Sequence, residues 1–291
     1  MDAKQIARFR RFSRSVTAEV GALDTSFLGR GRPLGSARVL NAIGQGHTDV
    51  ADVRDYLGLD SGLMSRLLRG LEREGLVETQ QHRDDARRRV ARLTSAGREE
   101  YDAYEDLSDA QAAALLRRHP QPDVLLAAMD LVAATFGRDR IVVAERDPRD
   151  DEARGCLNAY YLELADRLDQ GFDVSRSRDP EADDMIRPRG AFLVAELDRL
   201  AVGCVGLKGT GGTVGEIKRL WIAPSVRGLG LSRRLMAAAE DAARSLSMTT
   251  LRLDTNSALP EALHLYRNSG WVEIPRFNDD PYPDVFFEKR L

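Results

Sequence analysis

Apolar side chains recur every three or four residues through the first 27 residues, which predicts one amphipathic helix over 4–27. A stretch with several glycines and a proline then interrupts the pattern. Two short runs, 76–80 and 90–93, predict a pair of strands. Further helices are predicted over 36–45, 49–57, 61–74, 95–119 and 123–136. The first half of the chain is therefore expected to be mainly helical, with one hairpin.

The pattern changes near residue 140, and strands alternate with helices from there on. Helices are predicted over 150–169, 228–247 and 260–269, and a polar loop over 173–190. The chain is long enough for two separate cores. We therefore expect two domains, 1–139 and 140–291. The predicted strands of the second domain are 141–145, 191–197, 201–207, 213–222, 250–254, 271–274 and 284–290.

The composition is that of an ordinary globular protein. Hydrophobic residues make up 43% of the chain and the formal net charge is −3, so this is not a uniformly basic nucleic-acid protein. Two cysteines and four scattered histidines give no metal-ligand spacing, so we expect no metal site. No apolar stretch approaches the ~20 residues of a membrane span, and the N-terminus does not resemble a signal peptide. We expect a cytoplasmic protein without a membrane partner.

The predicted helix 61–74 has two different faces. Met64, Leu67, Leu68 and Leu71 recur at helical spacing and predict a buried stripe. The opposite face carries small polar and arginine side chains, which suit phosphate contacts and base edges in a major groove. A merely solvated face would look the same, so that alternative stays open. The candidate DNA-binding residues of this helix are Ser61, Gly62, Ser65, Arg66 and Arg69.

The two strands that follow this helix flank a cluster of arginines. A hairpin would hold such side chains at its tip, where they can enter a minor groove beside the helix. A solvated run of charges is the alternative for any cluster of this kind. The cluster consists of Arg83, Arg87, Arg88, Arg89 and Arg92.

Residues 49–97 resemble the MarR family of transcriptional regulators. Residues 71–77 (Leu-Glu-Arg-Glu-Gly-Leu-Val) end the helix, Asp85-Ala86-Arg87 matches the family's Asp-x-Arg signature, and Leu93-Thr94 and Gly97 follow. The resemblance implies a mainly α winged helix-turn-helix domain. It also implies a homodimer, formed through the N- and C-terminal helices, that reads a palindromic operator in double-stranded DNA. Asp85 would position Arg87. Gly62 and Leu63 depart from the family's frequent Ser or Thr, which leaves the base code open.

A glycine-rich turn precedes the predicted helix 228–247. The strand before it ends at Pro224, and Arg227-Gly228-Leu229-Gly230 runs into the helix. Free backbone N–H groups and the helix dipole favour a pyrophosphate at such a turn. It is not a Walker loop, because no Gly-Lys-Ser/Thr follows. A glycine pair before a helix is also often only a cap, so the turn alone leaves both possibilities open.

Residues 141–291 are similar to the GNAT family of N-acetyltransferases. Arg227, Gly230 and Ser232 occupy the defining places of its Arg/Gln-x-x-Gly-x-Gly/Ala signature, with Ser232 as a small departure. Residues 265–271 and 286–289 resemble the family's Leu-Tyr-x-x-x-Gly-Phe segment and closing strand. The resemblance implies an α/β acyl-CoA N-acyltransferase fold with a mixed, largely antiparallel sheet, and acetyl-CoA as cofactor. It implies cofactor contacts at Leu220, Trp221, Ile222, Arg227, Gly228, Leu229, Gly230, Leu231, Ser232, Arg233 and Asn256.

Amide formation needs a neutral amine that attacks the thioester, an acceptor for its proton and a donor to the departing thiolate. Glu216, on the strand before the glycine turn, occupies the place of a base carboxylate in some GNAT enzymes. Tyr266 matches the family's usual acid. An ion pair with Lys218 or Arg219 is the alternative for Glu216, and simple packing on the sheet is the alternative for Tyr266.

The acceptor in this family is held by the first helix of the domain and the loop after it. Tyr160 and Tyr161 are therefore candidate substrate-binding residues, with ordinary core packing as the alternative. Backbone N–H groups in 220–222 are expected to polarise the thioester carbonyl. The loop 173–190 would determine the acceptor, but its sequence does not identify it.

Three functions follow from these two resemblances. The first is a bifunctional protein, both operator-binding regulator and acetyltransferase of a small amine or amino-acid-like substrate. The second is a pure regulator whose GNAT domain only senses an acyl-CoA or an amine. The third is an acetyltransferase that uses the winged helix for dimerisation alone. Asp85 and Arg87 argue against the third function, and Glu216 and Tyr266 argue against the second.

Overall fold

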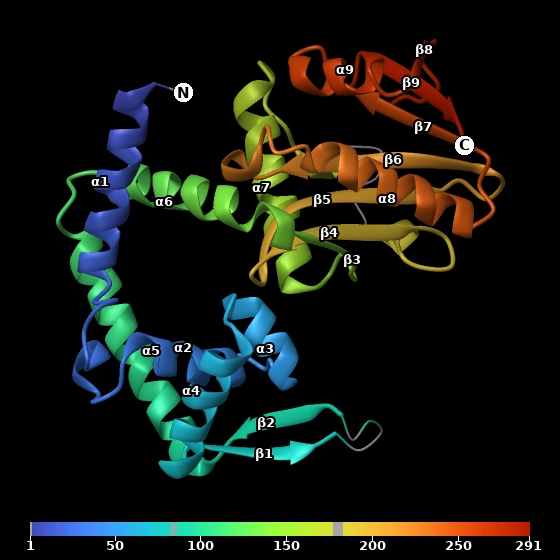
Figure 1. Ribbon diagram of the computed structural model, residues 1–291. Coiled ribbons are helices and arrows are strands. Elements are labelled where there is room, and N and C mark those ends of the chain that lie inside the picture. Colours follow the sequence, from blue (N-terminus) through green and yellow to red (C-terminus); the bar gives the residue numbers. More distant parts are fainter. Residues whose placement is uncertain (1, 83–84, 86, 177–182) are drawn as a thin grey trace. The chain divides into compact units, whose positions relative to one another are not determined.

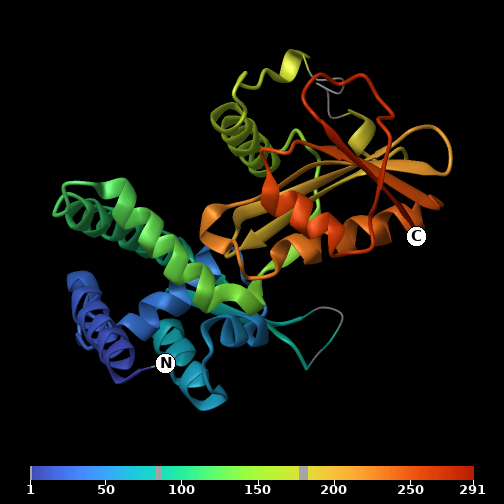
Figure 2. The same ribbon diagram turned by 90° about the horizontal axis from the view of Figure 1, so that it is seen from above.

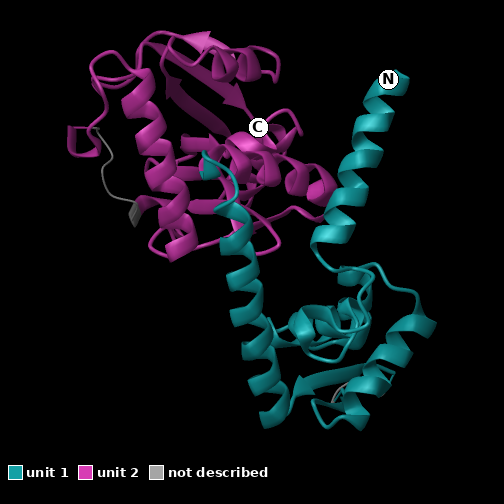
Figure 3. Ribbon diagram, turned by 90° about the vertical axis from the view of Figure 1, so that its left-hand side faces the viewer, with its two compact units in different colours: residues 1–122 teal, residues 123–291 magenta. Residues whose placement is uncertain are grey.

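The computed structural model describes residues 2–82, 85, 87–176 and 183–291. The chain divides into two compact units, 1–122 and 123–291 (Figure 3). This division lies earlier than the expected boundary after residue 139. The reason is the helix α6, Pro122–Gly137, whose Ala134 joins the core of the second unit and whose Gly137 lies against Leu197.

The first unit is a helical domain with one hairpin (Figure 1). Its buried core comes from α2 to α5 and the hairpin, and includes Leu40, Val53, Met64, Leu68 and Leu71. Strands β1 and β2 pair antiparallel from Val77–Leu93 to Gln81–Arg89. The elements are α1 (Ala3–Glu19), α2 (Leu34–Gly44), α3 (Val50–Leu57), α4 (Ser61–Arg73), β1 (Val77–Gln81), β2 (Arg89–Leu93) and α5 (Ser95–Leu116).

Helix ends in the first unit follow local chemistry. The side chains of Asp49, Asp60 and Thr94 cap α3, α4 and α5 by accepting backbone N–H groups of the first turn. The expected helix 4–27 is too long, because α1 ends at Glu19 and Gly21 takes a left-handed φ of 62°. The apolar residues beyond it belong to a turn rather than to the helix.

The second unit is built on a seven-stranded sheet in the order β3-β4-β5-β6-β7-β9-β8. Only β6 and β7 pair in parallel among the described strands, which confirms the mixed, largely antiparallel sheet. The strands are β3 (Val142–Glu145), β4 (Ala191–Leu197), β5 (Leu200–Gly209), β6 (Val214–Ile222), β7 (Thr250–Thr255), β8 (Val272–Ile274) and β9 (Val285–Arg290). The remaining helices are α7 (Asp151–Arg167), α8 (Leu231–Ser245) and α9 (Pro260–Arg267).

Helices cover both faces of this sheet. Phe192 and Val194 of β4 pack with α7 on one face, whereas Leu193 and Ala195 pack in the cluster that includes α8 and α9. The alternation follows from the two-residue period of a strand. Seen from above, the sheet separates the yellow-green α7 from the orange α8 (Figure 2).

The two parallel strands separate part of the way along their length. The last β6–β7 pair is Ile217 with Leu253, although β6 continues to Ile222 and β7 to Thr255. On its other edge β6 is irregular, because Arg219 takes a left-handed φ of 57° where the register with β5 shifts. The divergence opens a split in the middle of the sheet.

Some general features hold for the described residues. No helix among them is long and apolar enough to cross a membrane. No group of three or more His, Cys, Asp or Glu side chains among them is placed to hold a metal ion. Cys156 and Cys204 are both buried and free.

Candidate functional site

Two adjoining hollows lie at the split between β6 and β7. The loop-side groove is bounded by Trp221, Ile222, the glycine turn and the starts of α8 and α9, and encloses about 430 Å³. The inner pocket is bounded by α7, β6 and the end of β7, and encloses about 120 Å³. Both are lined by Tyr160, Leu164, Leu220, Leu259 and Ala262, so the groove and the pocket adjoin.

The glycine turn is shaped to receive an anion. Gly228 and Gly230 have φ of +79° and +81°, and no described atom lies within 4 Å of a Cβ built on either. Because both glycines take left-handed conformations, α8 begins at Leu231 rather than at the predicted residue 228. No side chain caps the helix, so N–H groups of its first turn stay available for phosphate oxygens. Ser232 and Arg233 also line the groove.

Two predicted cofactor residues do not reach this groove. Leu229 packs against the core of the second unit. Asn256 lines the inner pocket instead, and its amide is engaged in holding its own loop. Its Nδ2 donates to the carbonyl of Tyr282 at 2.6 Å, and its Oδ1 accepts from the N–H of Ala258 at 2.8 Å.

The guanidinium of Arg227 points to α7. Its Nη2 lies 2.5 Å from Glu163 Oε2, and its Nε donates to the carbonyl of Ile222 at 3.0 Å. The indole Nε1 of Trp221 donates to the same Glu163 oxygen at 3.0 Å. The turn residue Arg227 and the strand β6 are therefore joined to α7 by one carboxylate.

A second ionic contact crosses from α7 to α9. Arg167 pairs with Glu163 one helical turn away at 3.2 Å, and its guanidinium also bonds Glu261 and the carbonyl of Ala258. Sequence reasoning missed both Arg167 and Glu261. Only the i,i+4 spacing of Glu163 and Arg167 indicated a pair.

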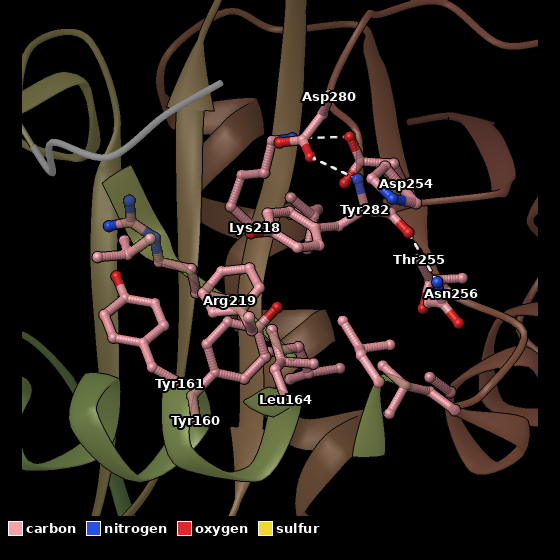
Figure 4. A pocket seen from close by; sticks show the side chains of 18 of the residues that line it. Tyr160, Tyr161, Leu164, Lys218, Arg219, Asp254, Thr255, Asn256, Asp280 and Tyr282 are labelled. Carbon is pink, nitrogen blue, oxygen red and sulfur yellow. Dashed lines mark hydrogen bonds and ion pairs between the residues drawn. The ribbon is translucent and has the colours of Figure 1, made fainter. Parts of the chain in front are cut away.

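Aromatic side chains form much of the inner pocket (Figure 4). Tyr266 is buried against Trp271 and Phe287, with ring centroids 6.0 and 5.6 Å away. Burial, and then the charge of Asp254, raises the pKa of Tyr266 well above its ordinary value. The predicted Tyr160 and Tyr161 also line the pocket and are half-buried. Hydroxyl groups with raised pKa values stay protonated and can act as donors.

A carboxylate that sequence reasoning passed over also lies in the pocket. Asp254 Oδ2 accepts from Lys218 Nζ at 2.8 Å and from Asn278 Nδ2 at 2.6 Å. Figure 4 draws Lys218 and Asp254 side by side, with Asp280 next to them. The only indication in the sequence was the position of Asp254 at the end of a buried strand.

The predicted base Glu216 lies outside both hollows. It is 5% exposed and lines neither the groove nor the pocket. Its Oε2 lies 3.6 Å from Lys218 Nζ, which is the ion pair named as the alternative. A role for Glu216 in proton transfer would have to act through Lys218 or a water molecule.

The first unit presents the predicted DNA-binding face of α4 to solvent. Met64, Leu68 and Leu71 are buried, as the apolar stripe predicted. The residues of the opposite face, Ser61, Gly62, Ser65, Arg66 and Arg69, are all exposed. Within the first unit, this face is therefore open to solvent.

The arginines of the hairpin differ in what they contact. Arg87 is exposed, and its backbone N–H donates to Asp85 Oδ1 at 3.0 Å. Arg88 Nε instead lies 2.6 Å from the buried carboxylate of Asp49, and Arg89 bonds the hydroxyl of Thr79 at 2.5 Å. Both are thus tied to their own domain. Arg83 and the Ala86 of the Asp-x-Arg signature lie outside the described residues.

Family models match both parts of the chain. One for the acetyltransferase (GNAT) family matches residues 157–271, and one for the MarR family matches residues 30–88. An IAA acetyltransferase of Azospirillum brasilense is 36% identical over 112 residues, which cover 37% of this chain and 72% of the relative. The uncharacterized N-acetyltransferase YjgM of Escherichia coli is 30% identical over 113 residues, 36% of this chain and 66% of the relative.

Part of the chain is similar to solved structures. An acetyltransferase of the GNAT family from Staphylococcus aureus Mu50 matches with 18% identity and a TM-score of 0.46, over 52% of this chain and 98% of that one. The family matches and the curated relatives decide the identity. The chain belongs to the acetyltransferase (GNAT) family as an acyl-CoA-dependent N-acetyltransferase, and it carries a MarR-family domain ahead of the acetyltransferase domain.

Proposed function

We propose that this chain is bifunctional. Its first unit binds a palindromic operator in double-stranded DNA. Its second unit transfers the acetyl group of acetyl-CoA to the amino group of a small amine or amino-acid-like acceptor. The observation that supports the enzymatic half is that the loop-side groove and the inner pocket adjoin and share five lining residues. A pyrophosphate at the glycine turn would leave the acyl end pointing towards Tyr266.

The chemistry of transfer assigns roles to a few groups. The nitrogen of the neutral amine attacks the thioester carbonyl carbon, and the carbon–sulfur bond breaks. Backbone N–H groups of Leu220 to Ile222, beyond the last β6–β7 pair, would stabilise negative charge on the carbonyl oxygen. Tyr266 would give its proton to the departing thiolate, because its raised pKa keeps the hydroxyl protonated. A carboxylate near the pocket takes the proton that the nitrogen loses.

The regulatory half rests on exposure and on apolar surface. The exposed face of α4 would enter a major groove, with Arg87 of the hairpin in the adjoining minor groove. A palindromic site requires two copies related by a two-fold axis. We propose that α1 and α6 form the homodimer, since each exposes several large apolar side chains.

Thiol release from acetyl-CoA with a panel of amines and amino acids tests the enzymatic half. The parent protein should release thiol only when an acceptor is present. Tyr266→Phe should lower kcat by about 10²–10³-fold while leaving acetyl-CoA affinity unchanged, because the ring and its packing are kept.

In the parent, kcat should not fall between about pH 8 and pH 10, because Tyr266 keeps its proton.

Two results would count against this proposal. Parental kcat in Tyr266→Phe would remove the tyrosine from the mechanism. Tight acetyl-CoA binding by a parent protein that releases no thiol with any amine would favour a sensor over an enzyme.

A further inference from the structure

Asp254 lies where the two central strands separate. The last paired residues are Ile217 and Leu253, so Lys218 and Asp254 are the first residues beyond the pair on each strand. Their side chains meet across the gap, and both line the inner pocket. The carboxylate therefore faces the pocket from the start of the split.

One oxygen of this carboxylate is engaged and the other is available. Oδ2 accepts from Lys218 and from Asn278. Within the described part of the chain, Oδ1 has no hydrogen-bond partner. The side chain is only 12% exposed and lines the pocket, so a donor of a ligand bound there can bond this oxygen in place of water.

Asp254 shares the inner pocket with the expected acid, Tyr266. Asp254 acts electrostatically on both Tyr266 and Tyr160, raising the pKa of each after the larger effect of burial. All three side chains line the same pocket. A carboxylate and a protonated phenol thus lie together where the groove for acetyl-CoA ends.

Glu216 offers no comparable arrangement. It lines neither hollow, and a buried Oε2 has no hydrogen-bond partner among the described residues. Its nearest opposite charge is Lys218, which lies between it and Asp254. Glu216 is therefore placed to balance the charge of Lys218 rather than to meet an acceptor.

We propose that Asp254, and not Glu216, is the carboxylate that binds the amino group of the acceptor; this assignment rests on the proposed acetyl transfer. An N–H of the amine donates to Asp254 Oδ1. As the carbon–nitrogen bond forms and the carbon–sulfur bond breaks, the proton of the nitrogen passes to Asp254, and the hydroxyl proton of Tyr266 passes to sulfur. Asp254 then returns a proton to the Tyr266 oxygen, directly or through water, which restores both groups.

Two matched neutral substitutions, Asp254→Asn and Glu216→Gln, test this assignment by thiol release. Asp254→Asn should lower kcat/KM for the amine by about 10²–10³-fold, and Glu216→Gln by less than about tenfold. Activity of Asp254→Asn should recover partly at high pH, where more of the amine is already neutral. Acetyl-CoA affinity, measured by calorimetry, should stay within about twofold for both variants.

A third variant guards against misfolding. Asn278→Ala removes a donor to Asp254 Oδ2 without changing a residue that lines the pocket. It should raise KM for the amine and leave acetyl-CoA affinity unchanged, because Asn278 holds the carboxylate of Asp254 and the backbone N–H of Asp280 but does not line the groove. A larger loss in Glu216→Gln than in Asp254→Asn, or parental kinetics in Asp254→Asn, overturns the assignment of Asp254 and leaves the proposed acetyl transfer standing. A parent protein that acetylates no amine overturns the proposed function, and this assignment with it.

Discussion

Two motif glycines, Gly97 and Gly230, are required for different physical reasons. A Cβ on Gly97 would lie 1.9 Å from the carbonyl oxygen of Leu76, so the neighbouring backbone excludes any side chain there. Gly230 has open space around it but a left-handed φ of +81°. The first glycine is thus needed for packing, whereas the second leaves room for a ligand.

Gly230→Ala should therefore weaken acetyl-CoA binding, because the new Cβ would crowd the phosphate, and we expect a loss on the order of tenfold in affinity. Gly211→Ala is the matched control, since Gly211 also has a positive φ of +88° and open space but lies away from the groove. Both variants should lose roughly 1–2 kcal/mol of stability from the left-handed backbone. Calorimetry with acetyl-CoA checks this, and equal affinities in the two variants would contradict the assignment of the loop.

The roles of side chains within local motifs could be predicted from the sequence. The contacts of side chains that strand pairing brings together could not. Tyr266 and the glycine turn lie in short segments with fixed spacing. The contacts of Asp254 with Lys218 and Asn278 depend on how β6, β7 and the loop before β9 come together. No periodicity encodes that arrangement, so the sequence indicates Glu216 through its place before the glycine turn but gives no sign of the contacts of Asp254.

Helices and strands were predicted well where caps and periodicity agree. Helix α4 begins after its cap Asp60 and ends just before the left-handed Gly75, close to the predicted range 61–74, whereas α1 is shorter than its apolar pattern suggested. The hairpin arginines look alike in sequence, but Arg88 crosses to Asp49 at the start of α3. Burial alone would raise the pKa of Asp49, yet Arg88 and the N–H groups of Ala51 and Asp52 hold it below its ordinary value.

Arg87→Ala and Arg88→Ala should consequently have different effects. Arg87→Ala should weaken operator binding by about 1–3 kcal/mol with unchanged stability. Arg88→Ala should destabilise the hairpin against α3. Because the pKa of Asp49 is lower in the folded state than in the unfolded state, its ionised form stabilises the fold at neutral pH, and this contribution is lost as the pH falls. The difference in unfolding free energy between the parent and Arg88→Ala should therefore shrink below about pH 4. Gel shifts at fixed salt and denaturation of the full chain measure both effects. A gap that widens in acid would contradict the Asp49 contact.

Helix α1 exposes apolar side chains that its own unit does not cover. None of the residues of α1, all of which the structure describes, is buried. Ile6, Phe9, Phe12 and Val16 are between 40% and 56% exposed. The sequence predicted the apolar face of α1, but it did not predict that α6 would belong to the second compact unit. An amphipathic helix whose apolar side chains stay exposed is typical of an association surface.

We therefore expect a dimer in light scattering at micromolar concentration. Phe9→Glu with Phe12→Glu should shift the mass towards the monomer, because charges would be buried in the interface. Leu200→Glu is the matched control, since Leu200 is also an exposed apolar residue, 62% accessible, but lies on the second unit's sheet. A parent protein with the mass of a monomer would refute the dimer, and an equal effect of Leu200→Glu would point to non-specific association.

The carboxylate of Glu163 accepts hydrogen bonds from both Trp221 of β6 and Arg227 of the glycine turn. Substitutions at these two donors should therefore not be independent. Once one donor is gone, the carboxylate can relax towards the other or towards Arg167, so a second substitution costs a different amount from the first. The effects of substituting Trp221 and Arg227 on the free energy of unfolding would then be coupled. The two residues would be constrained together although they lie six positions apart in the sequence.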